Sequence, residues 1–499
     1  MGNTSFSSLP PPPANFPYFA IVFRRSDRLI VVQADQQVTG VVRQVLGQLY
    51  IGIQEEKPWG GATEFKLVGV PFAERRDKTQ TVAMKRTCCG LLATLKTVGW
   101  ELVMSSDLSR TVDLTTWFFR KNVTVAQETT SPLICALSLS SYDKLQLVNA
   151  PNWLNPILTQ ILQPIIQNQQ VLGPSDFEVK LVGYPWTSRD FHEGVSARRM
   201  LLSIFRNFDA NRFVFAGTVN TKGTADSIFF QQTPEHVPGT QFTMISLNAS
   251  DRIRLIDSNE EIIAAVRDCI VKYWINGLQE ETPHPNVGCH EFKLSGYPWC
   301  TIGDEAVSAR LLITTILQTL VSKGWSLVTA LDVTRRDNDK AVFVLRNCAP
   351  CSVAHICLSP SDTDKLRIIN APQDVQAALA QVIRTFWPYG IMREGARPLA
   401  FEWKLNGNPW AAYSGSDFAL ARYLMCQILH QLALMGWRPI CSADVSSKFV
   451  KTENSSYPVD VHSIFFAYTG VAVQQQPQQE YGFPSGVDAP PPSYNQAVG

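Results

Sequence analysis

EFKLSGYPW, at residues 291–299, is the stretch that decides the fold, because the chain contains three further versions of it. These are EFKLVGVPF at 64–72, EVKLVGYPW at 178–186 and EWKLNGNPW at 402–410. Self-similarity at a fixed period, here about 110 residues, indicates a repeated structural unit. The sequence therefore predicts four tandem copies of one domain.

Other marks keep the same phase as this signature. SDRLIVV, YDKLQLV, SDRIRLI and TDKLRII precede it, at 26–32, 142–148, 250–256 and 363–369. The domain boundaries that follow are 17–127, 128–237, 238–351 and 352–470. A unit of about 110 residues exceeds a solenoid repeat and is long enough to own a hydrophobic core. We therefore expect four separately packed domains.

Within one copy, hydrophobic periodicity predicts five strands and two helices. Residues 355–360 and 365–369 alternate in the manner of a β-hairpin. Residues 373–387 carry apolar side chains at helical spacing, and 309–325 form a second apolar stripe that Gly324 ends. EFKL reads as a strand before a turn, and two more strands close the copy. We expect an α+β domain, ββαβαββ, with two helices on one face of a mixed sheet.

Composition excludes several classes of function. Lys plus Arg number 44 and Asp plus Glu 43, so the net charge of +1 offers no field to gather nucleic acid. The sequence has no run of about 18 apolar residues, so no membrane-spanning helix is predicted. It also lacks a basic start followed by an apolar stretch, so no secretory signal is predicted. The 11 cysteines are odd in number and scattered, as in reduced proteins. We expect a cytoplasmic protein.

Three kinds of polar residue recur in register. The Glu and Lys of each signature share one strand face, which we interpret as cross-strand pairs on a solvated surface. An acid recurs where the first hairpin turns, at Asp27, Asp143, Asp251 and Asp364. A third set is Asp107, Asp332 and Asp444, with Asn220 in the second copy. Too few oxygen ligands accompany this third set to predict a metal site.

An arginine recurs near the start of the second helix, at Arg198, Arg310 and Arg422. That end of a helix is unfavourable for a cation, so each arginine requires a partner. The preferred interpretation is a salt bridge to the signature Glu of its own domain, and the alternative is an anion site.

No histidine occupies a common repeat position, so no histidine-based catalytic or metal set is shared by the copies. The densest cluster is Cys348, Cys351, His355 and Cys357, which we interpret as core thiols and a surface histidine rather than zinc ligands. The repeated tryptophans are interpreted as core residues: Trp100, Trp325 and Trp437, and Trp186, Trp299 and Trp410. No catalytic residue, cofactor site or metal site is predicted.

The two ends differ from the repeats in composition. Residues 1–16 and 471–499 are rich in Pro, Gln, Ser, Ala and Gly and lack Lys and Arg, which predicts disorder. Pro491, Pro492 and Tyr494 form a PPxY motif, the ligand of class I WW domains such as those of HECT-type ubiquitin ligases. Leu9, Pro10 and Pro13 bound an LPPPP run that fits EVH1, SH3 or profilin-type grooves.

Gly2 opens a myristoylation-like start, although Phe6 stands where the pattern requires Ser or Thr. One acyl chain without a basic patch supports only weak, reversible membrane association.

These features favour a non-catalytic cytosolic adaptor whose repeats bind proteins and whose tails recruit proline-recognition modules. The alternative is a small-ligand protein or enzyme with a site in one copy, for which Arg189, Asp190 and His192 of the second copy are the candidates. Self-assembly through exposed sheet edges is a third hypothesis.

Overall fold

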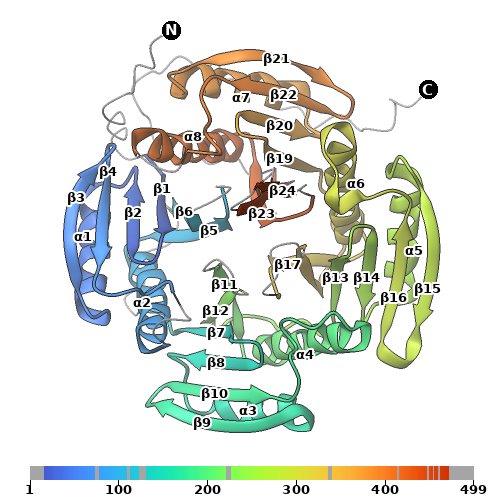
Figure 1. Cartoon of the computed structure of the whole chain (residues 1–499). Helices are drawn as coiled ribbons and strands as arrows, with labels where there is room; N and C mark the ends of the chain where they lie inside the picture. Colours follow the sequence, from blue (N-terminus) through green and yellow to red (C-terminus); the bar gives the residue numbers. More distant parts are fainter. Residues whose placement is uncertain are drawn as a thin grey trace.

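The computed structural model describes residues 16–73, 78–108, 113–122, 131–220, 226–334, 340–412, 415–446, 449–452, 455–458 and 461–470. They form four units with the same order of elements, which we call units 1 to 4 (Figure 1). The prediction of four tandem α+β units is confirmed.

The first two units have these elements. Unit 1 contains β1 (Tyr18–Arg24), β2 (Arg28–Val32), α1 (Gln36–Leu49), β3 (Ile53–Trp59), β4 (Ala62–Leu67), α2 (Lys78–Thr97), β5 (Trp100–Ser106) and β6 (Asp113–Lys121). Unit 2 contains β7 (Ile134–Ser140), β8 (Lys144–Val148), α3 (Leu154–Leu162), η1 (Gln163–Ile165), β9 (Ile166–Gly173), β10 (Asp176–Leu181), α4 (Phe191–Ala210), β11 (Phe213–Val219) and β12 (Ser227–Gln232).

The other two units repeat the pattern. Unit 3 contains β13 (Phe242–Asn248), β14 (Arg252–Ile256), α5 (Glu260–Tyr273), β15 (Leu278–His284), η2 (Pro285–Val287), β16 (Cys289–Leu294), η3 (Pro298–Cys300), α6 (Gly303–Ser322), β17 (Trp325–Leu331) and β18 (Val342–Asn347). Unit 4 contains β19 (His355–Ser361), β20 (Lys365–Ile369), α7 (Gln373–Phe386), β21 (Ile391–Arg397), β22 (Ala400–Leu405), α8 (Gly415–Leu434), β23 (Trp437–Ala443), β24 (Phe449–Thr452), β25 (Ser455–Pro458) and β26 (Ser463–Tyr468).

Each unit builds one six-stranded sheet. In unit 1 the strand order is β3-β4-β2-β1-β6-β5, and the equivalent strands of the other units have the same order. The pairs along this sheet are antiparallel, so the predicted mixed sheet is wrong. The predicted order ββαβαββ is also wrong by one strand, because the structure has ββαββαββ. The missed strand is the outer edge strand of each sheet: β3, β9, β15 and β21. None of its residues is buried, so no apolar alternation marks it.

The helices follow from their apolar stripes. In α7, Val375, Leu379, Val382 and Ile383 are buried at helical spacing. In units 1, 3 and 4 the second helix ends just before a glycine with positive φ, as at Gly324 (φ 84°), the left-handed backbone that glycine adopts most readily. In unit 2 Arg212 (φ 63°) has this conformation.

The four units stand in a closed ring, with β5, β11, β17 and β23 near the centre and the outer edge strands at the periphery (Figure 1). The second helix of each unit packs on the first strand of the next: α2 on β7, α4 on β13, α6 on β19, and α8 on β1. The last contact joins unit 4 to unit 1. Such head-to-tail contacts form a ring when the rotation between neighbours closes.

Hydrophobic cores in this ring are shared between neighbours. Leu424 and Leu429 of α8 belong to one core with Tyr18, Ala20 and Val22 of unit 1. The other three cores likewise join units 3 and 4, units 2 and 3, and units 1 and 2. The expectation of separately packed domains is therefore wrong. Its physical reason lies in β1, β7 and β19, whose residues are buried on both faces and so require a cover on each side.

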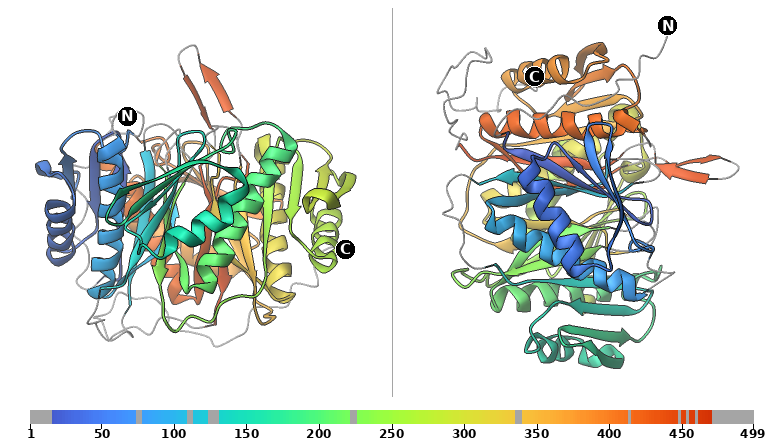
Figure 2. Two further views of the ribbon diagram at one scale, coloured as in Figure 1. Left: turned by 90° about the horizontal axis from the view of Figure 1, so that it is seen from below. Right: turned by 90° about the vertical axis from the view of Figure 1, so that its left-hand side faces the viewer.

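Unit 4 differs by a hairpin of β24 and β25, which projects from one face of the ring (Figure 2). Among the described residues, no helix combines the length and the apolarity that a membrane crossing requires.

Candidate functional site

The signature glutamates are buried, against the expectation of a solvated face. Glu64, Glu178, Glu291 and Glu402 are between 2% and 5% exposed. Each accepts from a cross-strand donor, as the expected cross-strand pairing requires: Arg28 for Glu64, Lys144 for Glu178, and Arg252 for Glu291. This sheet face turns toward the preceding unit, since Ile30, which lies opposite Glu64, packs in the core that unit 1 shares with unit 4.

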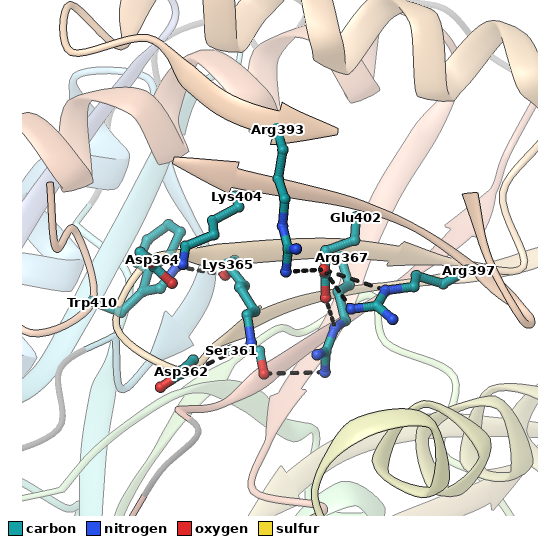
Figure 3. A network of polar contacts seen from close by, with 10 residues as sticks. All are labelled: Ser361, Asp362, Asp364, Lys365, Arg367, Arg393, Arg397, Glu402, Lys404 and Trp410. Carbon is teal, nitrogen blue, oxygen red and sulfur yellow. Dashed lines mark hydrogen bonds and ion pairs between the residues drawn. The ribbon is translucent and has the colours of Figure 1, made fainter. Parts of the chain in front are cut away.

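Unit 4 has the densest form of this network (Figure 3). Glu402 accepts from Arg367 Nε at 2.7 Å and from Arg397 Nη2 at 3.1 Å, and Arg393 Nη2 lies 4.0 Å away. Burial alone would raise the pKa of Glu402, but the hydrogen bonds and charges of Arg367 and Arg397 hold it below its ordinary value. Arg367 also donates to Ser361 Oγ at 3.2 Å. The carboxylate therefore ties together strands β20, β21 and β22.

The recurrent aspartates lie at the turn of the first hairpin, as predicted. Their backbone oxygens accept from the last residue of the signature strand, as in Leu67 N to Asp27 O (2.8 Å) and Leu405 N to Asp364 O (2.7 Å). The Asp364 carboxylate lies 3.5 Å from Lys404 Nζ. These residues fix the turn to the sheet.

The recurrent arginines do not bind the glutamate of their own unit, so the predicted intradomain salt bridge is wrong. Arg198 Nε donates to Ser246 Oγ of unit 3 at 2.7 Å. Arg310 donates to Ser463 Oγ and Ser446 O of unit 4, both at 2.8 Å. The equivalent residue of unit 1 is Lys85, whose Nζ donates to Gln146 Oε1 of unit 2 at 3.3 Å, and the equivalent residue of unit 4 is Arg422. We call these four residues the interface cations, because each lies between two units.

The third recurrent set clasps neighbouring units around the centre of the ring. Each member directly follows an innermost strand and bonds a residue of the preceding unit that lies in its last strand or close before it. Asp332 O accepts from Asp226 N (2.9 Å), Asp444 O from Ala341 N (3.0 Å), and Asp107 O from His462 N (3.1 Å). Asn220 N donates to Thr115 Oγ1 at 2.7 Å. The repeat of this residue is therefore a consequence of ring assembly.

Two of these clasps include buried charged groups. Lys340, 3% exposed, donates to Asp444 Oδ2 at 2.8 Å. Asp226 accepts from Asp332 N at 2.8 Å and from Asn220 Nδ2 at 3.1 Å. Burial nevertheless raises the pKa of Asp226 to about 6. These carboxylates hold neighbouring units together through hydrogen bonds.

The repeated tryptophans are packing residues, as predicted. Trp186, Trp299 and Trp410 are fully buried, and each indole donates to a backbone oxygen of its own unit at 2.7 to 3.0 Å. Trp100, Trp325 and Trp437 are at most 6% exposed.

The interpretation of Cys348, Cys351, His355 and Cys357 as core thiols and a surface histidine is wrong in part. His355 is 3% exposed and therefore not a surface residue, and its Nδ1 lies 3.0 Å from Val353 O. Cys357 is buried, whereas Cys351 is exposed and Cys348 intermediate, so only one of the three thiols is a core residue. In the described ranges no group of three or more His, Cys, Asp and Glu side chains is arranged to hold a metal ion.

Arg189, Asp190 and His192, the candidate pocket residues of unit 2, do not line the cleft that the structure has at the boundary of this unit. Asp190 caps α4 by accepting from Glu193 N at 2.9 Å, and the ring of His192 makes an edge-to-face contact with Phe191. A cleft of about 290 Å³ instead lies where unit 2 meets unit 3, and its lining includes Arg206, Asp257, Asn259 and Trp325.

The tail predictions fall outside the described residues. They concern Gly2, Leu9, Pro10, Pro13, Pro491, Pro492 and Tyr494.

One domain-family model matches the chain four times, at residues 17–120, 133–231, 241–346 and 354–467. The chain belongs to that domain family. Its four family domains correspond to units 1 to 4 of the ring. Neither curated proteins nor solved structures yield a match to the chain.

Proposed function

We propose that the chain is a non-catalytic cytosolic adaptor, in which a rigid ring of four family domains carries two proline-rich tails. One observation supports this proposal above the others. The polar residues that recur in the units bond to the sheet or to the neighbouring unit: the signature glutamates, the interface cations and the residues of the central clasps. The repeated chemistry therefore serves assembly, and recognition is assigned to the surfaces and the tails.

The C-terminal tail supplies the most specific recognition element. Pro491, Pro492 and Tyr494 match the PPxY ligand of WW domains. A polyproline segment binds at low cost in conformational entropy because it is extended before binding. The proposed partners are WW-domain proteins, HECT-type ubiquitin ligases among them, and EVH1, SH3 or profilin-type proteins are proposed for the run between Leu9 and Pro13.

Binding of the full chain to a panel of purified class I WW domains tests the proposal. We expect Tyr494→Ala to weaken the affinity at least tenfold, about 1.4 kcal/mol, because the tyrosine fills its own pocket. Tyr481→Ala is the matched control, since Tyr481 lies in the same tail outside the motif. Equal affinity of the wild type and Tyr494→Ala, measured by calorimetry, would refute WW-domain recruitment through this motif.

A further inference from the structure

The outer edge strands of the four sheets differ in how they are protected from pairing. β3, β9, β15 and β21 each end their sheet, with β4, β10, β16 and β22 on the inner side. An edge strand presents backbone N–H and C=O groups that can pair with another chain, and charges or proline on the strand prevent this.

Three of the four edge strands carry such protection at matching positions. Glu56, Glu281 and Glu394 lie opposite the second residue of the EFKL-type strand. Each pairs with an arginine of the first helix: Arg43 with Glu56, Arg267 with Glu281, and Arg384 with Glu394. Two residues further along, Pro58 of β3 and Pro283 of β15 have no N–H to donate.

β9 of unit 2 lacks these features. Gln169 occupies the position of the glutamates and bonds Thr159 at 3.1 Å instead of an arginine. Val171 occupies the position of the prolines and is 70% exposed, and Leu172 beside it is 43% exposed. From Leu145 to Ser175 the chain contains no Asp, Glu, Lys, Arg or His. The segment from Leu145 of β8 through α3 and β9 to Ser175 is therefore free of charge.

The open side of β9 presents its backbone groups at Gln169 and Val171. The Gln169 amide donates to the Asn168 side chain at 2.8 Å rather than to β10. In an antiparallel pair, alternate residues point their N–H and C=O groups away from the partner strand. Val171 follows Gln169 by two residues in unbroken register, so its N–H points outward as well. Proline at the same position of β3 and β15 removes this outward donor.

We propose that β9 is a self-association edge, which pairs antiparallel with β9 of a second copy of the chain and joins two rings about a two-fold axis. Charge indicates that the partner is a second copy of β9. An uncharged strand that pairs with its own copy brings no like charges together. If β15 paired with its own copy, Glu280 and Glu281 would lie near the same glutamates of the other chain. A two-fold interface uses the same surface on both subunits, as this edge allows. Depletion of charge is also the mark of an interface centre. The adaptor function is not required for this inference.

The test measures the mass of the full chain by sedimentation and light scattering as its concentration rises. We expect the wild type to shift from the 55.6 kDa monomer toward twice that mass, without larger species, because the new sheet has no second β9 edge to offer. Val171→Pro gives unit 2 the residue of β3 and β15, and we expect it to raise the dissociation constant of the dimer at least tenfold. The double variant Thr159→Arg with Gln169→Glu restores the ion pair of the sister units, and we expect it to weaken the dimer as well.

Ala396→Pro is the matched control, because Ala396 has the position of Val171 on β21 of unit 4. We expect this control to leave the mass curve unchanged. Circular dichroism of each variant separates loss of pairing from loss of fold, and the double variant serves if Val171→Pro unfolds. A wild type that stays monomeric, or a folded Val171→Pro chain that dimerises like the wild type, would overturn the proposal; a larger assembly through another edge would do so too.

Discussion

The interface between units 3 and 4 and the interface between units 4 and 1 use the same helix position in different ways. Arg310 of α6 donates hydrogen bonds to Ala306 O, Ser446 O and Ser463 Oγ. Arg422 of α8 likewise donates to the carbonyl one turn earlier, Phe418 O at 3.3 Å, and its guanidinium lies 3.8 Å from the centre of the Phe418 ring. Arg24 of unit 1 lies 5.1 Å from the centre of the same ring. At the interface between units 4 and 1, Phe418 thus adds cation–π contacts with one arginine from each unit.

The difference shows that the packing of helix on sheet, and not one particular bond, defines the ring. The strand position that carries Ser246 at the interface of units 2 and 3 carries Val22 at the closing interface. Apolar burial there replaces a hydroxyl acceptor. Three predictions test how far the interfaces are independent.

Arg310→Ala should have the largest effect. The arginine is 1% exposed, and its removal leaves a cavity and the buried Ser463 and Ser446 acceptors without their cationic donor. We expect the free energy of unfolding to fall by about 3 kcal/mol, measured by chemical denaturation. Lys323→Ala, at an exposed position one residue beyond α6, is the control and should change stability by less than about 0.5 kcal/mol. A loss below about 1 kcal/mol for Arg310→Ala would contradict the assigned role.

Acid should weaken both interfaces through buried histidines. Burial lowers the pKa of His430, on α8, and of His355, on β19, from 6.5 to about 4. The unfolded chain therefore binds protons first as pH falls, so stability is unaffected above pH 6.5 and declines between pH 6.5 and 4. At pH 5 each histidine should cost about 2 kcal/mol.

His430→Gln isolates the closing interface, because α6 carries Gln318 at the same helix position. We expect this variant to lose less stability than the wild type between pH 7 and pH 5, by about 2 kcal/mol. Denaturant midpoints at several pH values provide the measurement. An identical pH dependence in both proteins would show that His430 does not titrate during unfolding.

Val22→Ser should have the smallest effect of the three. At the interface of units 2 and 3 the equivalent residue, Ser246, accepts a hydrogen bond from Arg198. We therefore expect a serine at position 22 to accept a bond from Arg422, which offsets part of the lost apolar burial. We expect a cost of less than about 1 kcal/mol relative to Val22→Ala, measured by the same denaturation. If serine costs much more than alanine here, the two interfaces are not interchangeable at this position.

Much of the fold could be predicted from the sequence because the same apolar patterns recur in register in all four units. The EFKL strand, the first hairpin and both helices have periodic apolar residues that burial demands. The outer strand escaped prediction because a polar, exposed edge such as IQEEKPW has no buried face to impose alternation. The ring escaped as well, since the apolar second face of β1 shows that a cover exists but not which element supplies it.

The candidate site could be predicted only in part, for a related reason. Recurrence identified Arg310 and Asp444, and the helix-dipole argument correctly required a partner for the arginine. The partner lies in the next unit, so reasoning confined to one unit chose the wrong acceptor. Burial of Glu402 was missed because alternation along a strand shows which residues share a face, but not whether that face is covered.

Closure of the ring by α8 on β1 makes this polypeptide equivalent to a cyclic tetramer whose subunits are covalently joined. In a tetramer of identical subunits, every substitution appears four times and all contacts must remain alike. In a joined chain a substitution appears once, so α8 can carry Phe418 one turn before Arg422 while α6 keeps Ala306 one turn before Arg310. Linkage thus gives each quarter of the assembly its own freedom to diverge.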